Sequence, residues 1–325
     1  MEAELLLALD GGGTKTLALL ADRGGHVLGL GRSGPSNPLS VGDGEAVKNA
    51  LSAAEMALGC HDAGKIAAIG LYIPGFGRCQ GQMPAAFAKA RVWSDAYSAY
   101  YACLGRAGGI VVLAGTGSFA LGIDEAGKSH TAGGWGHLLG DEGSGYDIGR
   151  RALRGLLSRD EAGLPPTGLD RRVMDALGID SPRGALRAVY APGADRGRIA
   201  SLCPLVAQGA EAGEADACTI LEEAAGALSE LAVQVAAKMG PGPHETALTG
   251  GVAQMGASIL TPFERRLHAA CPQLRLTRPR YSPVTGAMLH LMQEEGYADA
   301  GMGERIEAEL REMREEKHHA DGYLL

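Results

Sequence analysis

The segment from Leu9 to Ala18 reads L-D-G-G-G-T-K-T-L-A and could bind phosphate. The glycines Gly11–Gly13 carry no Cβ atom, so their backbone N–H groups can approach an anion closely. The hydroxyls of Thr14 and Thr16 would add donors. Asp10 stands at the mouth of this turn and could hold Mg²⁺ through water, because Mg²⁺ keeps part of its hydration shell in proteins. A plain glycine-rich hairpin with a surface aspartate is the alternative interpretation of this segment taken alone.

The spacing of this segment excludes two common nucleotide loops. A Walker A loop requires G-x-x-x-x-G-K-[ST], a dinucleotide-binding loop requires G-x-G-x-x-G, and both lead directly into a helix. Here an apolar run of strand length, residues 17–21, follows the glycines. Residues 5–9 and 26–30 are similar runs, so the sequence predicts an antiparallel meander with a glycine hairpin between its first two strands.

A second segment of the same design follows about 100 residues later. The apolar run 110–113 leads into A-G-T-G-S at residues 114–118, and the apolar run 119–123 comes next. This repetition predicts two related halves, each with one phosphate loop. Residues 246–249 also form a strand-like run, and the two glycines after it could admit a flat ligand such as adenine. The alternative for those glycines is the ordinary packing of a turn that begins a helix.

Residues 90–99 read A-R-V-W-S-D-A-Y-S-A and predict the end of a strand, a turn and a helix over residues 96–104. Asp95 in this turn could act as a general base. A sugar hydroxyl that attacks the γ-phosphate of ATP needs a carboxylate to accept its proton, while Mg²⁺ and backbone donors neutralise the phosphoryl charge. The alternative is that Asp95 simply caps the helix, a common role for aspartate.

Residues 133–145 read G-G-W-G-H-L-L-G-D-E-G-S-G. Each glycine costs backbone entropy when it becomes ordered, so this density around a tryptophan, a histidine and two acids favours a binding loop over a scaffold segment. For His137 and Asp141 the alternative is a satisfied polar pair. A zinc site is not predicted, because no third ligand is evident.

The composition of the chain limits its partners and its location. The 325 residues suffice for two lobes with separate cores. A net charge of -8 argues against nucleic acid as a partner and favours a small molecule. The six cysteines are scattered without a C-x-x-C pair, which fits a reducing cytoplasm. Neither a signal peptide nor a membrane-spanning segment is predicted, so no membrane partner is expected.

Five segments together resemble the N-acetylglucosamine kinase family: L-D-G-G-G-T-K-T, S-D-A-Y, A-G-T-G-S, G-G-W-G-H-L-L-G-D-E-G-S-G and L-T-G-G-V. That family shares its fold with glucosamine kinases and with the BadF/BadG/BcrA/BcrD activator ATPases. The resemblance covers about residues 5–292 and implies an α/β, two-lobed actin-like ATPase (ribonuclease H-like) fold that closes on ATP in an interlobe cleft. The lobes would be residues 1–105 and 106–285. Residues 286–325 would form C-terminal helices, the first of which packs back on the first lobe.

The resemblance implies an ATP-dependent kinase that phosphorylates the 6-hydroxyl of N-acetylglucosamine or a related amino sugar, with Mg²⁺ as cofactor. Asp95 resembles the family's catalytic base, and Asp10 would hold Mg²⁺ through water. The implied nucleotide-binding residues are Gly11, Gly12, Gly13, Thr14, Lys15, Thr16, Thr116, Gly117, Gly250 and Gly251. The implied sugar-binding residues are Asn37, Asp95, Thr116, Ser118, Gly134, Trp135, Gly136 and Asp141. The resemblance is also compatible with a homodimer.

Several alternatives stay open at this point. Phe119 stands where the animal version of the family has a polar asparagine, so N-acetylglucosamine, glucosamine and N-acetylmuramic acid all remain candidate substrates. An activator ATPase of a CoA-ester reductase or dehydratase would need cysteines for an iron–sulfur cluster, but Leu113-Ala114 occupies the place of the cysteine beside the second loop. A transcriptional sugar sensor would need an N-terminal helix-turn-helix, and the first predicted strand, which begins by Leu5, leaves no room for one.

Residues 303–318 are charged at helical spacing, and Glu307 and Arg311 form a favourable i,i+4 pair. The sequence therefore predicts a solvated helix without a functional role at this end of the chain.

Overall fold

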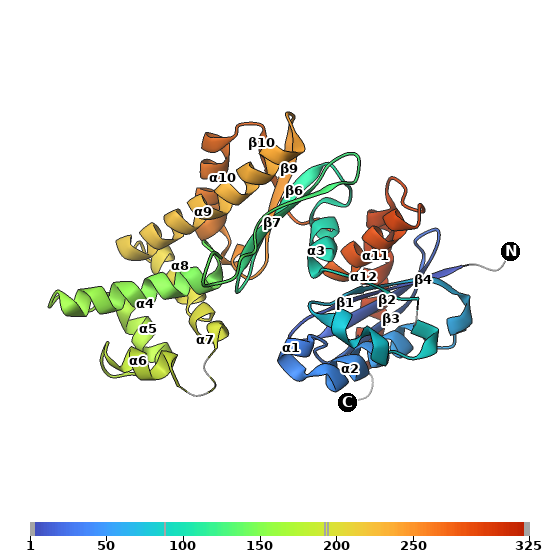
Figure 1. Ribbon diagram of the computed structural model, residues 1–325, viewed down its shortest axis with the longest axis horizontal. Helices are drawn as coiled ribbons and strands as arrows, with labels where there is room; N and C mark the ends of the chain where they lie inside the picture. The colour runs from blue at the N-terminus through green and yellow to red at the C-terminus, as the bar shows by residue number, and fades with distance from the viewer. Residues whose placement is uncertain (1–3, 88, 192, 194, 322–325) are drawn as a thin grey trace. The chain divides into compact units, whose positions relative to one another are not determined.

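The structure, a computed structural model, describes residues 4–87, 89–191, 193 and 195–321. It divides into two compact units. The first is formed by the residues up to 106 together with those from 279 onward, and the second by residues 107–278. Each unit contains one five-stranded sheet with helices packed against it (Figure 1). Both units are therefore α/β, as the sequence predicts.

The first unit has the strand order β3-β2-β1-β4-β5. Its strands are β1 (Leu5–Gly11), β2 (Thr16–Asp22), β3 (Val27–Ser33), β4 (Ile66–Tyr72) and β5 (Arg91–Trp93). Its α-helices are α1 (Pro38–Val41), α2 (Asp43–Leu58), α3 (Asp95–Leu104), α11 (Pro283–Glu294) and α12 (Met302–Asp321). Its 3₁₀ helices are η1 (Ala63–Lys65), η2 (Phe76–Gln82) and η3 (Ala85–Phe87).

The first sheet combines a meander with parallel strands. β1, β2 and β3 pair antiparallel, which confirms the meander predicted from the apolar runs, whereas β4 and β5 continue the sheet parallel to β1. Side chains alternate between the two faces of a strand. Leu5, Leu7 and Leu9 enter a core with α2, and Asp10 points to the other face, where it contacts α3. Helices α3 and α11 pack against each other and against β1.

Helix α12 corrects the prediction of a solvated helix. Met302, Ile306 and Leu310 lie one helical turn apart and are buried. The carboxylate of Glu307 accepts hydrogen bonds from Ser282 N at 3.0 Å and from Thr285 Oγ1 at 2.6 Å. The expectation was wrong because a narrow apolar stripe suffices to bury one face of a helix, even when most of its residues are charged.

The second unit has the strand order β10-β9-β6-β7-β8. Its strands are β6 (Gly109–Ala114), β7 (Ser118–Ile123), β8 (Ser129–Gly133), β9 (His244–Thr249) and β10 (Leu274–Thr277). Its helices are α4 (Gly145–Glu161), α5 (Gly168–Leu177), α6 (Gly184–Val189), α7 (Arg196–Ala200), α8 (Cys203–Glu211), α9 (Ala215–Met239), α10 (Ala257–Ala270) and the 3₁₀ helix η4 (Ala253–Met255).

The second sheet repeats the combination of a meander with parallel strands. β6, β7 and β8 pair antiparallel, while β9 and β10 extend the sheet parallel to β6. The predicted strands at residues 110–113 and 119–123 are confirmed. One core cluster joins residues of β6 and β7 with apolar residues of α4 and α9. No helix in the described part of the chain combines the length and the apolar character that a membrane span requires.

Candidate active site

The first group of predicted site residues lies at one edge of the first sheet. β1, β4 and β5 run parallel and end at Gly11, Tyr72 and Trp93. Asp10 is therefore the penultimate residue of β1, and Asp95 follows β5 at the same carboxyl edge. In open α/β sheets, ligands bind at the carboxyl ends of parallel strands. This edge is the candidate site of the first unit.

The glycine hairpin between β1 and β2 is fixed against the segment before α1. Gly12 N donates to Lys15 O at 3.1 Å and closes the turn. The backbone N–H groups of Ser36 and Asn37 both donate to Gly12 O, each at 3.1 Å. A Cβ atom on Gly11 would collide with Ser36 Oγ, which explains the glycine there. The hairpin therefore lies directly beside Asn37, while Gly13, Thr14 and Lys15 are exposed.

Thr16 lies differently from the expectation that its hydroxyl would face a phosphate. The side chain is fully buried, and its Oγ1 lies 2.8 Å from Gly34 O and 2.7 Å from Ser36 Oγ. The hydroxyl is hydrogen-bonded inside the protein because Thr16 begins β2 and its side chain faces the segment before α1. Thr16 thus holds the hairpin in place.

Asn37 is held in position by helix capping. Its side-chain oxygen accepts a hydrogen bond from Leu39 N at 2.9 Å and caps α1. An asparagine side chain also carries two amide hydrogens, which this cap does not use. Asn37 can therefore donate to a ligand without giving up its structural role.

Asp95 does not cap α3, so the capping alternative is wrong. Ser94 takes that place, because its Oγ accepts a hydrogen bond from Ala96 N at 3.2 Å. Asp95 is the first residue of the helix and is partly buried. Burial raises the pKa of its carboxyl group, although hydrogen bonds, the one from Ser94 foremost, oppose the shift.

Asp10 is coupled to the helix that carries Asp95. Its Oδ1 accepts a hydrogen bond from Ser98 Oγ at 2.7 Å. Burial raises the pKa of Asp10 to about 6; the Ser98 bond opposes this rise and the negative charge of Asp95 adds to it. A cation bound beside Asp10 would stabilise its charged form against burial and against the negative charge of Asp95.

The loops of the second unit also gather at the carboxyl edge of its sheet. β6 ends at Ala114 and its parallel neighbour β9 ends at Thr249. Val252 N donates to Ala114 O at 2.9 Å, and a Cβ atom on Gly250 would lie 2.5 Å from the same oxygen. The loop that contains Thr116 and Gly117 therefore lies beside the Gly250-Gly251 turn. The structure brings these predicted nucleotide-binding residues together.

Asp141 lies against the second hairpin, the loop that joins β6 to β7. Its φ of +65° is the one left-handed value among the described non-glycine residues, and its side chain is 5 % exposed. Asp141 Oδ1 accepts a hydrogen bond from Ser118 N at 3.2 Å, and a Cβ atom on Gly117 would lie 2.8 Å from Oδ2. His137 instead packs against Tyr146, with ring centroids 5.1 Å apart. The alternative of a satisfied pair between His137 and Asp141 is thus wrong.

Gly134, Trp135 and Gly136 follow β8 beside the same hairpin. Gly134 N donates to Ser118 O at 3.1 Å, which joins this loop to the start of β7. Gly140 N donates to Gly136 O at 2.8 Å and closes the turn. The side chain of Trp135 is 74 % exposed, so its ring can contact a ligand.

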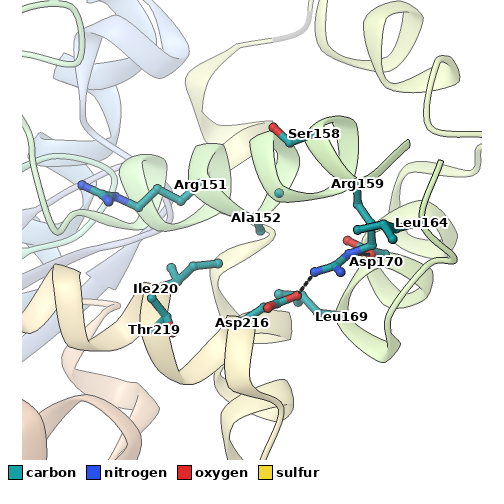
Figure 2. A pocket seen from close by; sticks show the side chains of 11 residues that line it. Arg151, Ala152, Ser158, Arg159, Leu164, Leu169, Asp170, Asp216, Thr219 and Ile220 are labelled. Atoms are coloured by element: carbon teal, nitrogen blue, oxygen red, sulfur yellow. Dashed lines mark hydrogen bonds and ion pairs between the residues drawn. The ribbon is translucent and has the colours of Figure 1, made fainter. Parts of the chain in front are cut away.

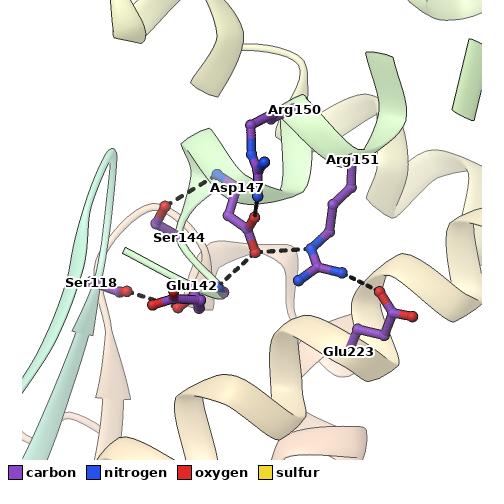
Figure 3. A network of polar contacts seen from close by, with 8 residues as sticks. Ser118, Glu142, Ser144, Asp147, Arg150, Arg151 and Glu223 are labelled. Carbon is purple, nitrogen blue, oxygen red and sulfur yellow. Dashed lines mark hydrogen bonds and ion pairs between the residues drawn. The ribbon is translucent and has the colours of Figure 1, made fainter. Parts of the chain in front are cut away.

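Asp147 anchors the loop that follows Asp141, a role that the sequence interpretation missed. Its Oδ1 lies 2.7 Å from Arg150 Nη2 and its Oδ2 lies 2.9 Å from Arg151 Nε. Figure 3 shows the carboxylate between these two arginines, with Ser144 just before α4. Gly143 N also donates to Asp147 Oδ2 at 3.0 Å. Burial alone would raise the pKa of Asp147, but these hydrogen bonds outweigh it and leave the pKa lowered. The spacing S-x-x-D, typical of a helix start, was the available signal.

A cavity of about 400 Å³ lies elsewhere in the second unit, among α4, α5 and α9 (Figure 2). Two cations line it, and both are paired: Arg159 with Asp170 and Asp216, and Arg151 with Asp147 and Glu223. No predicted site residue lines it. Because its positive charge is already neutralised, this cavity does not offer the chemistry of a phosphate site.

Mg²⁺ fits the carboxylates of the first unit. Proteins usually bind Mg²⁺ through one or two carboxylates together with water and substrate phosphates. Asp10, with its raised pKa and its neighbour Asp95, offers this donor set beside the exposed glycine hairpin.

The sequence profile described as the BadF/BadG/BcrA/BcrD ATPase family matches residues 7–290. An N-acetyl-D-glucosamine kinase of Dictyostelium discoideum is 28 % identical over 314 residues, which cover 89 % of this chain and 98 % of that protein. An N-acetylmuramic acid/N-acetylglucosamine kinase of Clostridium acetobutylicum is 30 % identical over 203 residues, which cover 62 % of this chain and 66 % of that protein.

Solved structures of sugar kinases share the fold of this chain. A protein from Chromobacterium violaceum, described as a candidate N-acetylglucosamine kinase, aligns with a TM-score of 0.71 and 29 % identity over 90 % of this chain and 99 % of its own. A ROK hexokinase from Thermus thermophilus shares the fold, with a TM-score of 0.50 and 17 % identity over 90 % and 100 % of the two chains. The fold is that of the actin-like ATPases and sugar kinases. Since the matched profile covers most of its length, the chain belongs to the BadF/BadG/BcrA/BcrD ATPase family.

Proposed function

We propose that this protein is an ATP-dependent amino-sugar kinase that transfers the γ-phosphate of ATP to the 6-hydroxyl of N-acetylglucosamine or a closely related amino sugar. The observation that carries the proposal is the pair of carboxylates, Asp10 and Asp95, at the carboxyl edge of the first sheet beside the glycine hairpin. The relatives that match this chain bear the names of amino-sugar kinases, which supports the choice of acceptor.

In this proposal Asp95 is the general base. The 6-hydroxyl oxygen of the sugar attacks the γ-phosphorus, its proton passes to the Asp95 carboxylate, and ADP leaves. A general base works best when its pKa approaches the working pH. Burial shifts the pKa of Asp95 in that direction. The position of Asp95 at the first residue of α3 also fixes its backbone, so the carboxylate needs little reorganisation.

The remaining predicted residues divide into three proposed roles. Asp10 would hold Mg²⁺ through water, and the ion would neutralise charge on the transferred phosphoryl group. The backbone of Gly11, Gly12 and Gly13 and the residues Thr14, Lys15, Thr116 and Gly117 would bind the phosphates, with Gly250 and Gly251 at the adenosine. The sugar would contact Asn37, Thr116, Ser118, Gly134, Trp135, Gly136 and Asp141.

Asn37 and Trp135 are suited to a sugar by their chemistry. Asn37 offers amide hydrogens beside the first hairpin, and Trp135 offers an exposed ring beside the second.

A cytoplasmic location is proposed as well, in keeping with the free cysteines. The homodimer suggested by the family resemblance remains a prediction.

An ADP-release assay across hexoses, 2-amino sugars and N-acetyl sugars, including N-acetylmuramic acid, tests this function. We expect one amino sugar to accelerate ATP consumption. Asp95→Asn should fold normally and lose about 10²- to 10⁴-fold in kcat, because the base is removed without a change in shape.

The matched control is Asp62→Asn, at an exposed aspartate that caps η1 in the same unit. Asparagine caps as well as aspartate does, so this variant should retain full activity. Near-normal turnover of Asp95→Asn, or ATP consumption that no sugar changes, would contradict the proposal.

A further inference from the structure

Ser98 links the Asp10 carboxylate to the helix that begins at Asp95, and the sequence analysis assigns it no role although it lies in the segment 90–99. It lies on α3 one helical turn after Asp95, and its side chain is buried, with 1 % exposed. Its Oγ lies 2.7 Å from Asp10 Oδ1 and 2.9 Å from the backbone oxygen of Asp95. A single hydroxyl thus reaches the end of β1 and the start of α3.

The chemistry of a hydroxyl decides which of these two contacts dominates. Serine has one proton to donate, so its bonds to Asp10 and to the Asp95 carbonyl compete. A hydrogen bond to an ionised carboxylate is about twice as strong as one to a neutral acceptor. The proton therefore goes to Asp10 while its carboxylate is charged. This bond occupies one oxygen of Asp10 and sets the orientation of the other.

Helix α3 is a rigid support for this bond. Gly286 of α11 lies directly against α3, because a Cβ atom there would collide with Ser98 O and Ala102 N. The helix can therefore shift little relative to α11, which itself packs against β1. A side chain that ties Asp10 to this helix also ties it to Asp95.

We propose that Ser98 is a positioning residue of the phosphoryl-transfer site. It holds the Asp10 carboxylate in the orientation that presents its second oxygen to a hydrated Mg²⁺, and it keeps Asp10 in register with Asp95. The part that concerns Asp95 rests on the proposed function. The part that concerns Asp10 requires only a magnesium–nucleotide complex.

A second serine provides a matched control. Ser229 on α9 is also buried within a helix, with 4 % of its surface exposed, and its Oγ donates to Gly226 O at 2.8 Å. Both serines thus contact the carbonyl three residues earlier, but only Ser98 of the two contacts a carboxylate. A difference between their alanine variants isolates the bond to Asp10.

The test measures binding of the non-hydrolysable ATP analogue AMPPNP by calorimetry, with Mg²⁺ and with EDTA. We expect Ser98→Ala to lose roughly tenfold in the affinity gained from Mg²⁺, as is typical for a lost hydrogen bond to a charged group, with unchanged metal-free binding. Ser229→Ala should leave both affinities unchanged. In an Asp10→Asn background, Ser98→Ala should have no further effect, because residues that act through one another are not additive.

Three results would overturn the proposal: an unchanged Mg²⁺ effect in Ser98→Ala, an equal loss in Ser229→Ala, or additive losses with Asp10→Asn. If Ser98→Ala does not fold, Ser98→Cys replaces it; its weak S–H donor should give a smaller loss in the same direction. An unchanged Mg²⁺ effect in Ser98→Cys would then count against the proposal.

The outcomes also separate this inference from the proposed function. If the Mg²⁺ effect depends on Ser98 but no sugar is phosphorylated, the kinase proposal fails and the positioning role stands. If a sugar is phosphorylated while Ser98→Ala binds magnesium–AMPPNP normally, only the positioning role fails. In the sugar assay, Ser98→Ala should lower kcat and leave the KM for the sugar unchanged, since no contact with the sugar is assigned to Ser98.

Discussion

His290 shows how burial sets the protonation of a single side chain in the first unit. It lies on α11 with 3 % of its surface exposed, and its Nδ1 is 2.7 Å from the hydroxyl of Tyr72. Its ring also stacks on Tyr97, with centroids 4.7 Å apart. Burial lowers the pKa of His290 to about 4. The folded protein therefore keeps a neutral imidazole where the unfolded chain would already be protonated.

This difference predicts a pH-dependent stability. Below pH 6.5 the imidazole of His290 is protonated in the unfolded chain, whereas in the folded protein it stays neutral down to about pH 4. The contribution of His290 to the free energy of unfolding is therefore fully present above pH 6.5 and is lost as the pH falls from 6.5 to about 4. The loss has an upper limit of about 3 kcal/mol. His290→Gln should therefore reduce the fall in unfolding free energy between pH 8 and pH 5, measured by urea denaturation.

The control is His61→Gln, at an exposed histidine of the same unit, which should keep the slope of the unmodified protein. Identical slopes for all three proteins would refute the role of His290.

Residue types and spacing predicted which side chains gather at the sheet edges, but not how each one is used. Ser94 and Asp95 are both good capping residues, and only the backbone geometry decides that Ser94 takes the cap. In the same way, Thr14 and Thr16 both carry hydroxyls, but Thr16 faces inward because β2 begins there. Ser98 escaped notice because its partner lies 88 residues away, on another element.

At the scale of elements, α11 and α12 stabilise each other through one carboxylate. Glu307 of α12 accepts hydrogen bonds from Ser282 N and Thr285 Oγ1 at the start of α11. A negative charge is favourable there, because the N-terminus of a helix carries partial positive charge and unpaired N–H groups. Glu307 therefore caps the N-terminus of α11, although it belongs to another helix.

Replacing this carboxylate should weaken the first unit. Glu307→Ala leaves the Ser282 N–H without its acceptor and should lower the free energy of unfolding by about 1–3 kcal/mol. Glu312→Ala, at an exposed position of the same helix, should change it by less than about 0.5 kcal/mol. Chemical denaturation of both variants provides the measurement, and equal stabilities would show that Glu307 does not cap α11.

The strands predicted around each hairpin and the helix predicted over residues 96–104 are confirmed. The runs 5–9, 17–21, 110–113 and 119–123 are all strands in the structure, and β3 contains the run 26–30 except for His26. Helix α5 was not predicted, although Thr167 and Asp170 form a capping box at its start. The buried face of α12 was missed because three apolar residues are easily lost among charges.

On the scale of the whole molecule, the first unit is assembled from both ends of the chain, whereas the second is continuous. Helix α12 holds these ends together. Besides its buried apolar stripe, its Glu309 accepts hydrogen bonds from Val27 N at 2.6 Å and pairs with His26 at 2.9 Å. Its removal should therefore affect one unit and spare the other.

We expect a chain that ends at residue 301 to show this selectivity. Hydrogen exchange should accelerate in β3 and α11, which lose the contacts of α12, and should stay unchanged in β6, β9 and α9. Mass spectrometry of the peptides reports both units in one experiment, so the second unit serves as the internal control. Equal acceleration throughout would mean that the two units do not unfold independently.

The split origin of the first unit also has a consequence for biosynthesis. A ribosome synthesises the entire second unit before α11 and α12, so β1 to β5 still lack two of their helices when the sequence of the second unit is complete. The sheet with the proposed base and magnesium ligand would then reach its final form last, only after the remaining residues have emerged. Synthesis that stops before α11 would thus yield a chain with the whole second unit and an unfinished proposed site in the first.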